Sequence, residues 1–246
     1  MDVKNFMSKT SIIVGRRHSG VSILMKSILH DLAPLLKTKI LISKCFGDKE
    51  EYDEMDICLD GEFDQNARRV LHRQIYMMER YWDSVLSNTV IVWEAYESVV
   101  PNITNELSVI SKKLNDENTT LFALSPSSGK QRGVCDFYGI KRNVKTVFDY
   151  AILGAFAPIN KREALRVSSS TEDDEYYEKI DEIQNLYDLF FSDIGSYELF
   201  EEIYKTCTSD YRFMVIDLKS DKPLQERVFW IKSSQKNLQK NLHKNK

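Results

Sequence analysis

The chain has 246 residues, and its 34 Lys and Arg residues against 37 Asp and Glu give a formal net charge of -3 at pH 7. This near-neutral balance excludes a histone-like polycation, so any contact with nucleic acid must come from a local basic patch. Apolar residues make up 42% of the chain, which is enough for a sizeable core and excludes global disorder.

Neither a membrane span nor a secretory signal is expected. The longest weakly polar run, Tyr150–Ile159, has about half of the roughly 20 residues that cross a bilayer. The residues before Ser11 contain no apolar region of the kind that a signal peptide needs. The four cysteines are scattered and form no CxxC pair, so we expect free thiols in a reducing compartment and no structural zinc site.

Hydrophobic periodicity predicts strands and helices in alternation up to Pro158. The first expected elements are a strand at Thr10–Val14, a helix from Ser22 to Leu35, and strands at Lys39–Ile42 and Met55–Leu59. They are followed by a long helix from Asp64, a strand at Thr89–Trp93, a helix capped near Asn102, and strands at Thr119–Leu124 and Val147–Leu153. This alternation is typical of right-handed crossovers, so we expect an α/β fold with a mostly parallel central sheet flanked by helices.

After Pro158 the pattern predicts a helical C-terminal segment with two closing strands. An acidic, polar run at residues 168–178 is expected to form a mobile loop. Helices are expected at Ile180–Phe190 and after the capping residue Ser196, and strands at Phe213–Leu218 and Arg227–Ile231. We therefore expect a single domain over residues 1–232 and a basic, flexible tail over 233–246.

The turn between the first strand and the first helix has the spacing of a phosphate-binding loop with one change. The run from Gly15 to Ser22 fits GxxxxGK[ST], except that Val21 stands where the lysine should be. In such a loop, backbone N–H groups and the helix N-terminus bind the phosphates, the lysine neutralises their charge, and the hydroxyl binds Mg²⁺. Loss of one preorganised electrostatic donor typically costs roughly 3–4 kcal/mol of transition-state stabilisation, and loss of a full cation should cost at least as much.

Two interpretations of this turn remain open. In the first, the backbone still forms an anion cradle, and an arginine earlier in the loop supplies the missing positive charge. In the second, the segment is an ordinary glycine-containing turn that binds no ligand. The nucleotide-binding candidates are Gly15, Arg16, Arg17, Ser19, Gly20, Val21 and Ser22.

A basic cluster also lies on the predicted long helix. It consists of Arg68, Arg69, His72 and Arg73. A solvated helix face explains such a cluster, and so does a contact with a nucleic-acid backbone or another subunit.

The order of these features resembles the poxvirus-type genome-packaging ATPases of large double-stranded DNA viruses, which are P-loop NTPases of the FtsK/HerA group. The resemblance runs from about Ser11 to Lys232 and rests on the order and spacing of motifs. Its most particular match is the closing pair of segments, Phe213–Asp217 and Val228–Lys232. It implies a single P-loop NTPase-like domain with a RecA-like sheet over residues 1–232.

The resemblance also implies which positions are catalytic, and at several of them this sequence lacks the side chain that the reaction needs. Thr89–Trp93 corresponds to the Walker B strand, Glu94 to its first acid, and Ala95 to the second acid that activates the attacking water. If Mg-nucleotide binds, Ser22 and Glu94 are the implied metal ligands. The polar sensor is replaced by residues 124–126 (Leu-Ser-Pro), and no arginine follows Asp149-Tyr150 where relatives carry one.

Several losses together suggest that the fold has been kept and the reaction lost. The expected function is that of a divergent, catalytically impaired packaging ATPase-like protein with degenerate Walker motifs, which serves as a structural or regulatory component of genome packaging. One alternative is an active DNA-packaging ATPase that uses Arg16 or Arg17 as the phosphate-loop cation. Another is an α/β interaction module that binds neither nucleotide nor DNA.

The partners and cofactors follow from the same resemblance. ATP and Mg²⁺ are the implied cofactors, double-stranded DNA and viral packaging or capsid proteins the implied partners, and a homo- or hetero-oligomeric ring the implied assembly. The implied location is the virion or the viral factory in the host cytoplasm. A basic stretch near aromatic residues gives the DNA-contact candidates Lys130, Arg132, Lys141, Arg142 and Lys145.

Overall fold

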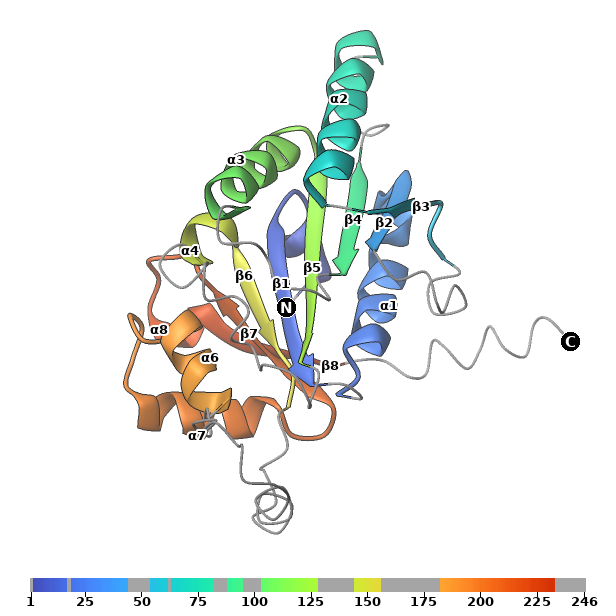
Figure 1. Ribbon diagram of the computed structural model, residues 1–246. Coiled ribbons are helices and arrows are strands. Elements are labelled where there is room, and N and C mark those ends of the chain that lie inside the picture. The colour runs from blue at the N-terminus through green and yellow to red at the C-terminus, as the bar shows by residue number, and fades with distance from the viewer. Residues whose placement is uncertain are drawn as a thin grey trace, which may run out of the picture.

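An eight-stranded sheet forms the centre of the structure, with helices on both of its faces (Figure 1). The computed structural model describes residues 2–16, 19–43, 54–61, 63–81, 88–94, 103–127, 144–155 and 182–232. Across the sheet the strands follow the order β3 (Ile57–Asp60), β2 (Thr38–Ser43), β4 (Thr89–Glu94), β5 (Thr119–Ser127), β1 (Thr10–Arg16), β6 (Tyr150–Leu153), β7 (Arg212–Asp217) and β8 (Val228–Lys232).

The direction of the strands confirms the expected α/β class. The first six strands in this order are parallel to one another. Strand β7 runs antiparallel to β6, and β8 runs antiparallel to β7, so the two closing strands form a hairpin at one side of the sheet. All six parallel strands therefore present their carboxyl ends at one edge, and β1 lies in the interior of the sheet between β5 and β6.

Side chains along each strand alternate between two apolar layers, one on each face of the sheet. From β1, Ile12 and Val14 enter one layer and Ile13 enters the other. The first layer lies under α2 (Phe63–Tyr81), α3 (Ile103–Asp116), α4 (Val144–Val147), α6 (Glu182–Phe190) and α7 (Tyr197–Cys207). The second layer lies under α1 (Val21–Leu32) and the short 3-10 turns η1 (Val3–Phe6) and η2 (Ala33–Leu35). Coverage on both faces explains why β4 is an uninterrupted buried run.

The boundaries of several predicted elements differ from the structure, two of them for a clear physical reason. The first helix ends at Leu32, and the next three residues form η2 around Pro34, because proline cannot donate the backbone bond that continues an α-helix. The strand predicted to start at Val147 starts at Tyr150, and Val147 is the last residue of α4. A short apolar run does not distinguish a buried helix from a buried strand, which explains the second difference.

Two hydrogen bonds join Asp149, the residue before β6, to Thr10 at the start of β1. Its backbone N–H donates to the carbonyl of Thr10 at 2.7 Å, and its carboxylate accepts from the N–H of Thr10 at 2.8 Å. Burial, followed by the charges of Asp217 and Asp149, raises the pKa of the neighbouring Tyr150 hydroxyl. These contacts lie at the amino edge of the sheet, away from the carboxyl ends of the parallel strands.

The helical C-terminal segment matches the expected pattern where the structure describes it. Ser196 caps α7 by accepting a hydrogen bond from the N–H of Leu199, as predicted. The short helix α8 (Leu224–Arg227) precedes β8 and includes Arg227, which we expected in the strand. Residues 168–178 and the tail over 233–246 lie outside the described residues.

None of the helices in the described ranges is long and apolar enough to cross a membrane. The longest of them, α2, has 19 residues and includes four arginines.

Removing the cap of α7 should lower the free energy of unfolding. We expect Ser196→Ala to cost about 1 kcal/mol in a urea titration, because the helix N-terminus then loses its side-chain acceptor. The matched variant Ser196→Asn keeps a capping oxygen and should remain close to wild type. Equal stability of all three proteins would show that the cap contributes nothing.

Candidate phosphate-binding site

The turn that follows β1 lies at the carboxyl edge of the parallel strands. Gly15 pairs with Pro126 on β5, and Val14 pairs with Leu153 on β6, so the chain leaves the sheet between two neighbours. It enters α1 through Gly20, whose φ of +90° is a left-handed conformation that favours glycine. Ligands of open α/β sheets bind outside the carboxyl ends of the strands, which is the position of this turn.

Two side chains close over the backbone of Gly15. A Cβ atom added to Gly15 would lie 2.5 Å from the Oγ of Ser19 and 2.5 Å from the Cγ2 of Val21. Both distances are too short for any side chain at this position unless its neighbours move. The requirement for glycine therefore comes from the tight curl of the turn.

Ser19 places an unsatisfied hydroxyl inside the turn. Its Oγ is buried and has no hydrogen-bond partner in the described part of the chain. Leaving a buried polar group without a partner costs about 1–3 kcal/mol, so a ligand that bonds to this hydroxyl would recover part of that cost. The hydroxyl is a feature that an anion-binding turn can use.

The N-terminus of α1 faces the same turn without a side-chain cap among the described residues. The first hydrogen bond of the helix joins the N–H of Leu24 to the carbonyl of Gly20 at 2.8 Å. The N–H groups of the preceding turn have no carbonyl within the helix to bond with. Together with the helix dipole, they give this end of α1 a partial positive charge that suits a phosphate.

Val21 takes an apolar role in this arrangement. Its side chain is partly buried and packs against the apolar layer beneath α1, while its Cγ2 lies over Gly15. Position 21 therefore contributes a methyl group beside Gly15 and no charge. Arg16 ends β1, but its side chain lies outside the described atoms, and so does the whole of Arg17. The proposed surrogate cation therefore stays a prediction.

Glu94 lies at the same edge of the sheet as the turn. It is the last residue of β4, is 7% exposed, and pairs with Leu124 of β5, which in turn pairs with Ile13 of β1. Strand β5 thus separates β4 from β1, which places the two strands about 10 Å apart. Alternation along β4 puts Glu94 on the face of Val90 and Val92, the face that α1 covers.

This placement is compatible with a role for Glu94 near a ligand at the start of α1. Ser22, its implied partner in holding Mg²⁺, is the second residue of α1 and is partly buried. Within the described ranges, no group of three or more His, Cys, Asp or Glu side chains is arranged to hold a metal ion by itself. Ala95 lies outside those ranges.

The second wall of the turn was not predicted from the sequence. Gly154, just after β6, donates from its N–H to the carbonyl of Val14 at 2.8 Å. A Cβ on Gly154 would lie 2.8 Å from the Cε1 of Phe213 and 3.3 Å from the Oγ of Ser19. The Tyr204 hydroxyl donates to the carbonyl of Gly154 at 2.6 Å and ties α7 to this wall. The closing segment that includes Phe213 matched the family pattern, but nothing in its sequence indicated that it contacts the first turn.

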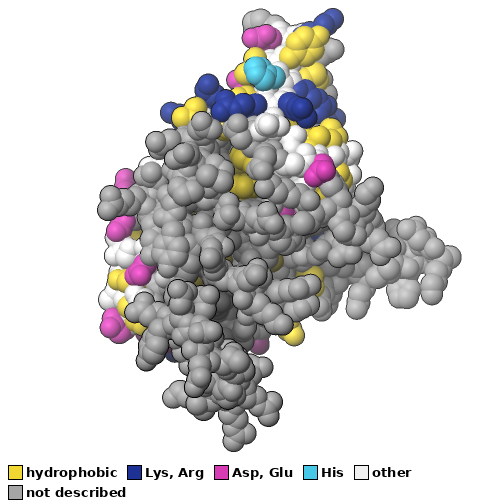
Figure 2. Space-filling model, in the orientation of Figure 1, with side chains coloured by type: hydrophobic (Ala, Val, Ile, Leu, Met, Phe, Trp, Pro, Cys, Tyr) yellow, Lys and Arg dark blue, Asp and Glu magenta, His cyan; other side chains and the backbone are white. Residues whose placement is uncertain are grey.

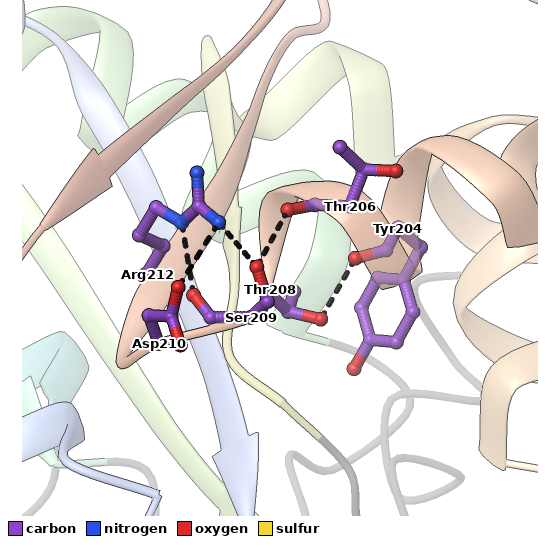
Figure 3. A network of polar contacts seen from close by, with 6 residues as sticks. All are labelled: Tyr204, Thr206, Thr208, Ser209, Asp210 and Arg212. Atoms are coloured by element: carbon purple, nitrogen blue, oxygen red, sulfur yellow. Dashed lines mark hydrogen bonds and ion pairs between the residues drawn. The ribbon is translucent and has the colours of Figure 1, made fainter.

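A polar network fixes the connection between α7 and β7 at the same edge (Figure 3). The Nε of Arg212 donates to the carbonyl of Ser209 at 2.9 Å, and its Nη2 lies 3.5 Å from the carboxylate of Asp210. The guanidinium also lies 5.0 Å from the centre of the Trp230 ring. Burial raises the pKa of the nearby Cys207 thiol, and the charge of Arg212 opposes that shift. These contacts hold Arg212 against the α7–β7 connection and the Trp230 ring of β8.

The remaining candidates fall outside what the structure describes. Four of the five DNA-contact candidates belong to this group: Lys130, Arg132, Lys141 and Arg142. The fifth, Lys145, is part of α4, but its side chain lies outside the described atoms. The structure thus brings Ser19 and Val21 against Gly15 of β1, with Gly20 and Ser22 beside them at the start of α1.

The packing of Val21 over Gly15 can be tested with a double-mutant cycle. Gly15→Ala should lower the free energy of unfolding by about 1–3 kcal/mol, because the new methyl collides with Ser19 and Val21. Combining it with Val21→Ala removes one collision, so the pair should lose at least about 0.5 kcal/mol less than the sum of the single losses. The exposed Val109→Ala is the control and should add to Gly15→Ala without coupling. Additive losses in the first pair would mean that Val21 does not cover Gly15.

Comparison with known proteins gives matches in structure only. No protein-family model and no curated protein matches the sequence. The genome packaging NTPase B204 from Sulfolobus turreted icosahedral virus 2, in complex with AMP, superposes with a TM-score of 0.52 at 12% identity, over 92% of this chain and 98% of that chain. Its complex with AMPPCP gives a TM-score of 0.51 at 11% identity over the same shares. The chain therefore has a P-loop NTPase-like α/β fold, shared with this viral packaging enzyme.

Proposed function

We propose that the chain is a divergent relative of the viral genome-packaging NTPases that has kept the phosphate-loop scaffold and lost ATP hydrolysis. Its role would be that of a structural or regulatory component of packaging. The observation that carries this proposal is the packing of Val21, which places a methyl group over Gly15 in the turn where the fold calls for a lysine. The likeness to a packaging NTPase that has been solved with AMP and AMPPCP supports the scaffold half of the proposal.

The turn has several features that suit the phosphates of a nucleotide. The N–H groups at the start of α1 and the unsatisfied Oγ of Ser19 would hold the phosphate oxygens. Ser22 and Glu94 would hold Mg²⁺, which supplies positive charge against the phosphates when it is bound. A weak nucleotide site that depends on backbone dipoles is therefore the binding activity that we propose.

The side chains that would drive ATP hydrolysis in the family are the ones that this sequence replaces. Val21 supplies no charge to the developing transition state, and loss of such a donor typically lowers the rate by about 10²–10³. The residue after Glu94 is Ala95, which has no carboxylate to activate water. Position 126, level with Gly15 in the sheet, is a proline and has no side-chain amide. Each loss removes a different part of the chemistry, so restoring one group should not restore turnover.

The proposed partners follow from a packaging role. We propose assembly in a ring, either of identical copies or with an active relative, together with viral packaging or capsid proteins. Contact with double-stranded DNA would involve the basic stretch from Lys130 to Lys145. The corresponding place of action is the virion or the site of viral assembly.

Restoring the missing charge should strengthen nucleotide binding. Val21→Lys should raise the affinity for Mg-ATP at least about tenfold, which corresponds to about 1.4 kcal/mol. The matched variant Val21→Met has an unbranched side chain without charge and should bind as weakly as wild type. Ligand-dependent melting shifts of the three proteins measure the difference, because a ligand that prefers the folded state raises its apparent stability.

Phosphate release from ATP tests the other half of the proposal. We expect the wild-type chain to release none above background, either alone or with DNA. Turnover by the wild type that disappears in Glu94→Gln would contradict the proposal. Turnover that disappears in Arg16→Ala or Arg17→Ala would instead identify an active motor with a surrogate cation. Failure of every variant to respond to nucleotide would favour an interaction module without a ligand.

A further inference from the structure

Helix α2 projects beyond the sheet at the edge opposite the candidate site (Figure 1). Its Gln74 is buried and donates to the Oγ1 of Thr89 and of Thr119, the first residues of β4 and β5. Gln74 therefore marks the level at which these strands begin. Seven residues follow it in the helix, and at 1.5 Å per residue they extend about 10 Å past the amino edge.

One flank of this helix is a stripe of arginines. The residues Arg69, Arg73, Tyr76 and Arg80 follow one another at steps of four, three and four, so they share a single face. All four are exposed, and Tyr76 is 51% exposed. Buried residues at steps of three and four hold the inward face against the core: Phe63, Asn66, Ala67, Val70 and Gln74. The helix is thus anchored on one side and presents cations on another.

A second group of cations lies next to the stripe. Arg68 and His72 are exposed one position before Arg69 and Arg73, and the exposed acid Glu79 is on their side of the helix rather than on the stripe. Figure 2 shows dark blue side chains and a histidine near the top of the molecule, where α2 and the neighbouring α3 lie in Figure 1. The net charge of the whole chain is -3, so this concentration of positive charge is local.

The spacing and chemistry of the stripe suit a regular polyanion. Arg69 and Arg73 are separated by about 6 Å along the helix axis, and the stripe from Arg69 to Arg80 extends over about 16 Å. Duplex DNA has one negative charge per about 1.7 Å of its axis, so several phosphates lie within reach of a stripe of this length. Arginine binds phosphate oxygens through a planar fork of donors, and all the strong cations of this helix are arginines.

The aromatic ring of Tyr76 lies in the stripe and contacts Arg80. Arg80 donates from its Nη1 to the Tyr76 hydroxyl, and its Cζ lies 5.5 Å from the centre of the ring. This contact holds Arg80 in line with Arg73 instead of leaving its long side chain free. A pre-ordered cation loses less side-chain entropy when it binds a phosphate.

We propose that the arginine stripe of α2 (Arg69, Arg73, Tyr76 and Arg80) binds the phosphate backbone of nucleic acid without sequence preference. The surface runs along α2 and past the amino edge of the sheet, whereas the candidate nucleotide turn lies at the carboxyl edge. The two can therefore act independently, and this inference holds whether or not the turn binds nucleotide. It also differs from the stretch between Lys130 and Lys145 that the sequence suggested.

The test is the salt dependence of DNA binding by the full chain and two triple variants. The stripe variant is Arg69→Gln/Arg73→Gln/Arg80→Gln. The control, Lys205→Gln/Lys219→Gln/Lys222→Gln, removes the same charge from exposed positions on α7 and near β8. A fluorescent random-sequence duplex and a single strand of equal length are the probes, and circular dichroism verifies that each variant is folded.

We expect the stripe variant to bind at least about tenfold more weakly than the control, with a log–log salt slope that is shallower by roughly 2 to 3. The charge-preserving variant Arg69→Lys/Arg73→Lys/Arg80→Lys should keep most of the slope. The inference is overturned if the stripe variant and the control bind alike or if the wild type does not bind DNA. It is also overturned if polyglutamate displaces the wild type as well as DNA does, since that result assigns the stripe to an acidic protein. Preference between the duplex and the single strand identifies which form of nucleic acid the stripe accepts.

Discussion

The central position of β1 constrains most of the structure around the candidate site. The chain leaves the sheet between β5 and β6 and must reverse within a few residues to place α1 on one face. That reversal brings Ser19 and Val21 against Gly15, where an added Cβ would collide with both side chains. Phe213 of β7 lies against Gly154 in a similar way. The same curl turns the N-terminus of α1 toward the carboxyl edge, so the backbone features that we propose for anion binding do not depend on a lysine at position 21.

Much of the fold could be predicted from local patterns. The β-branched run ending at Gly15, the four-residue apolar run inside β4 and the cap at Ser196 each have a local physical cause, and each predicted the right element. Sequence could not predict contacts between distant segments. The hydrogen bond from Tyr204 to Gly154 joins residues that are 50 positions apart. Strand β5 lies between β1 and β4 in the sheet, and no local pattern in the sequence indicates this order. The boundary near Val147 was wrong because a short apolar run fits both a helix and a strand.

The two proposed binding sites lie near opposite edges of the sheet. The carboxyl edge holds Gly15, Ser19 and Glu94, next to the N–H groups at the start of α1. Near the amino edge, α2 carries the exposed residues Arg69, Arg73 and Arg80, of which Arg80 lies past the edge. Helix α2 is anchored at Gln74 to the first residues of β4 and β5, and Glu94 is the last residue of the same β4. Strand β4 thus joins the proposed nucleotide site to the helix that carries the proposed nucleic-acid surface.

The most direct test of the account is an amide NMR titration of the labelled chain with Mg²⁺ and AMPPCP. We propose that the turn after β1 has kept an anion cradle and lacks the cation of a phosphate loop. We therefore predict saturable, weak shifts centred on the amides of Ser19, Gly20, Val21 and Ser22, with little change elsewhere in the sheet. Absence of any shift at these amides at saturating ligand, or shifts centred on another part of the molecule, would contradict the proposal.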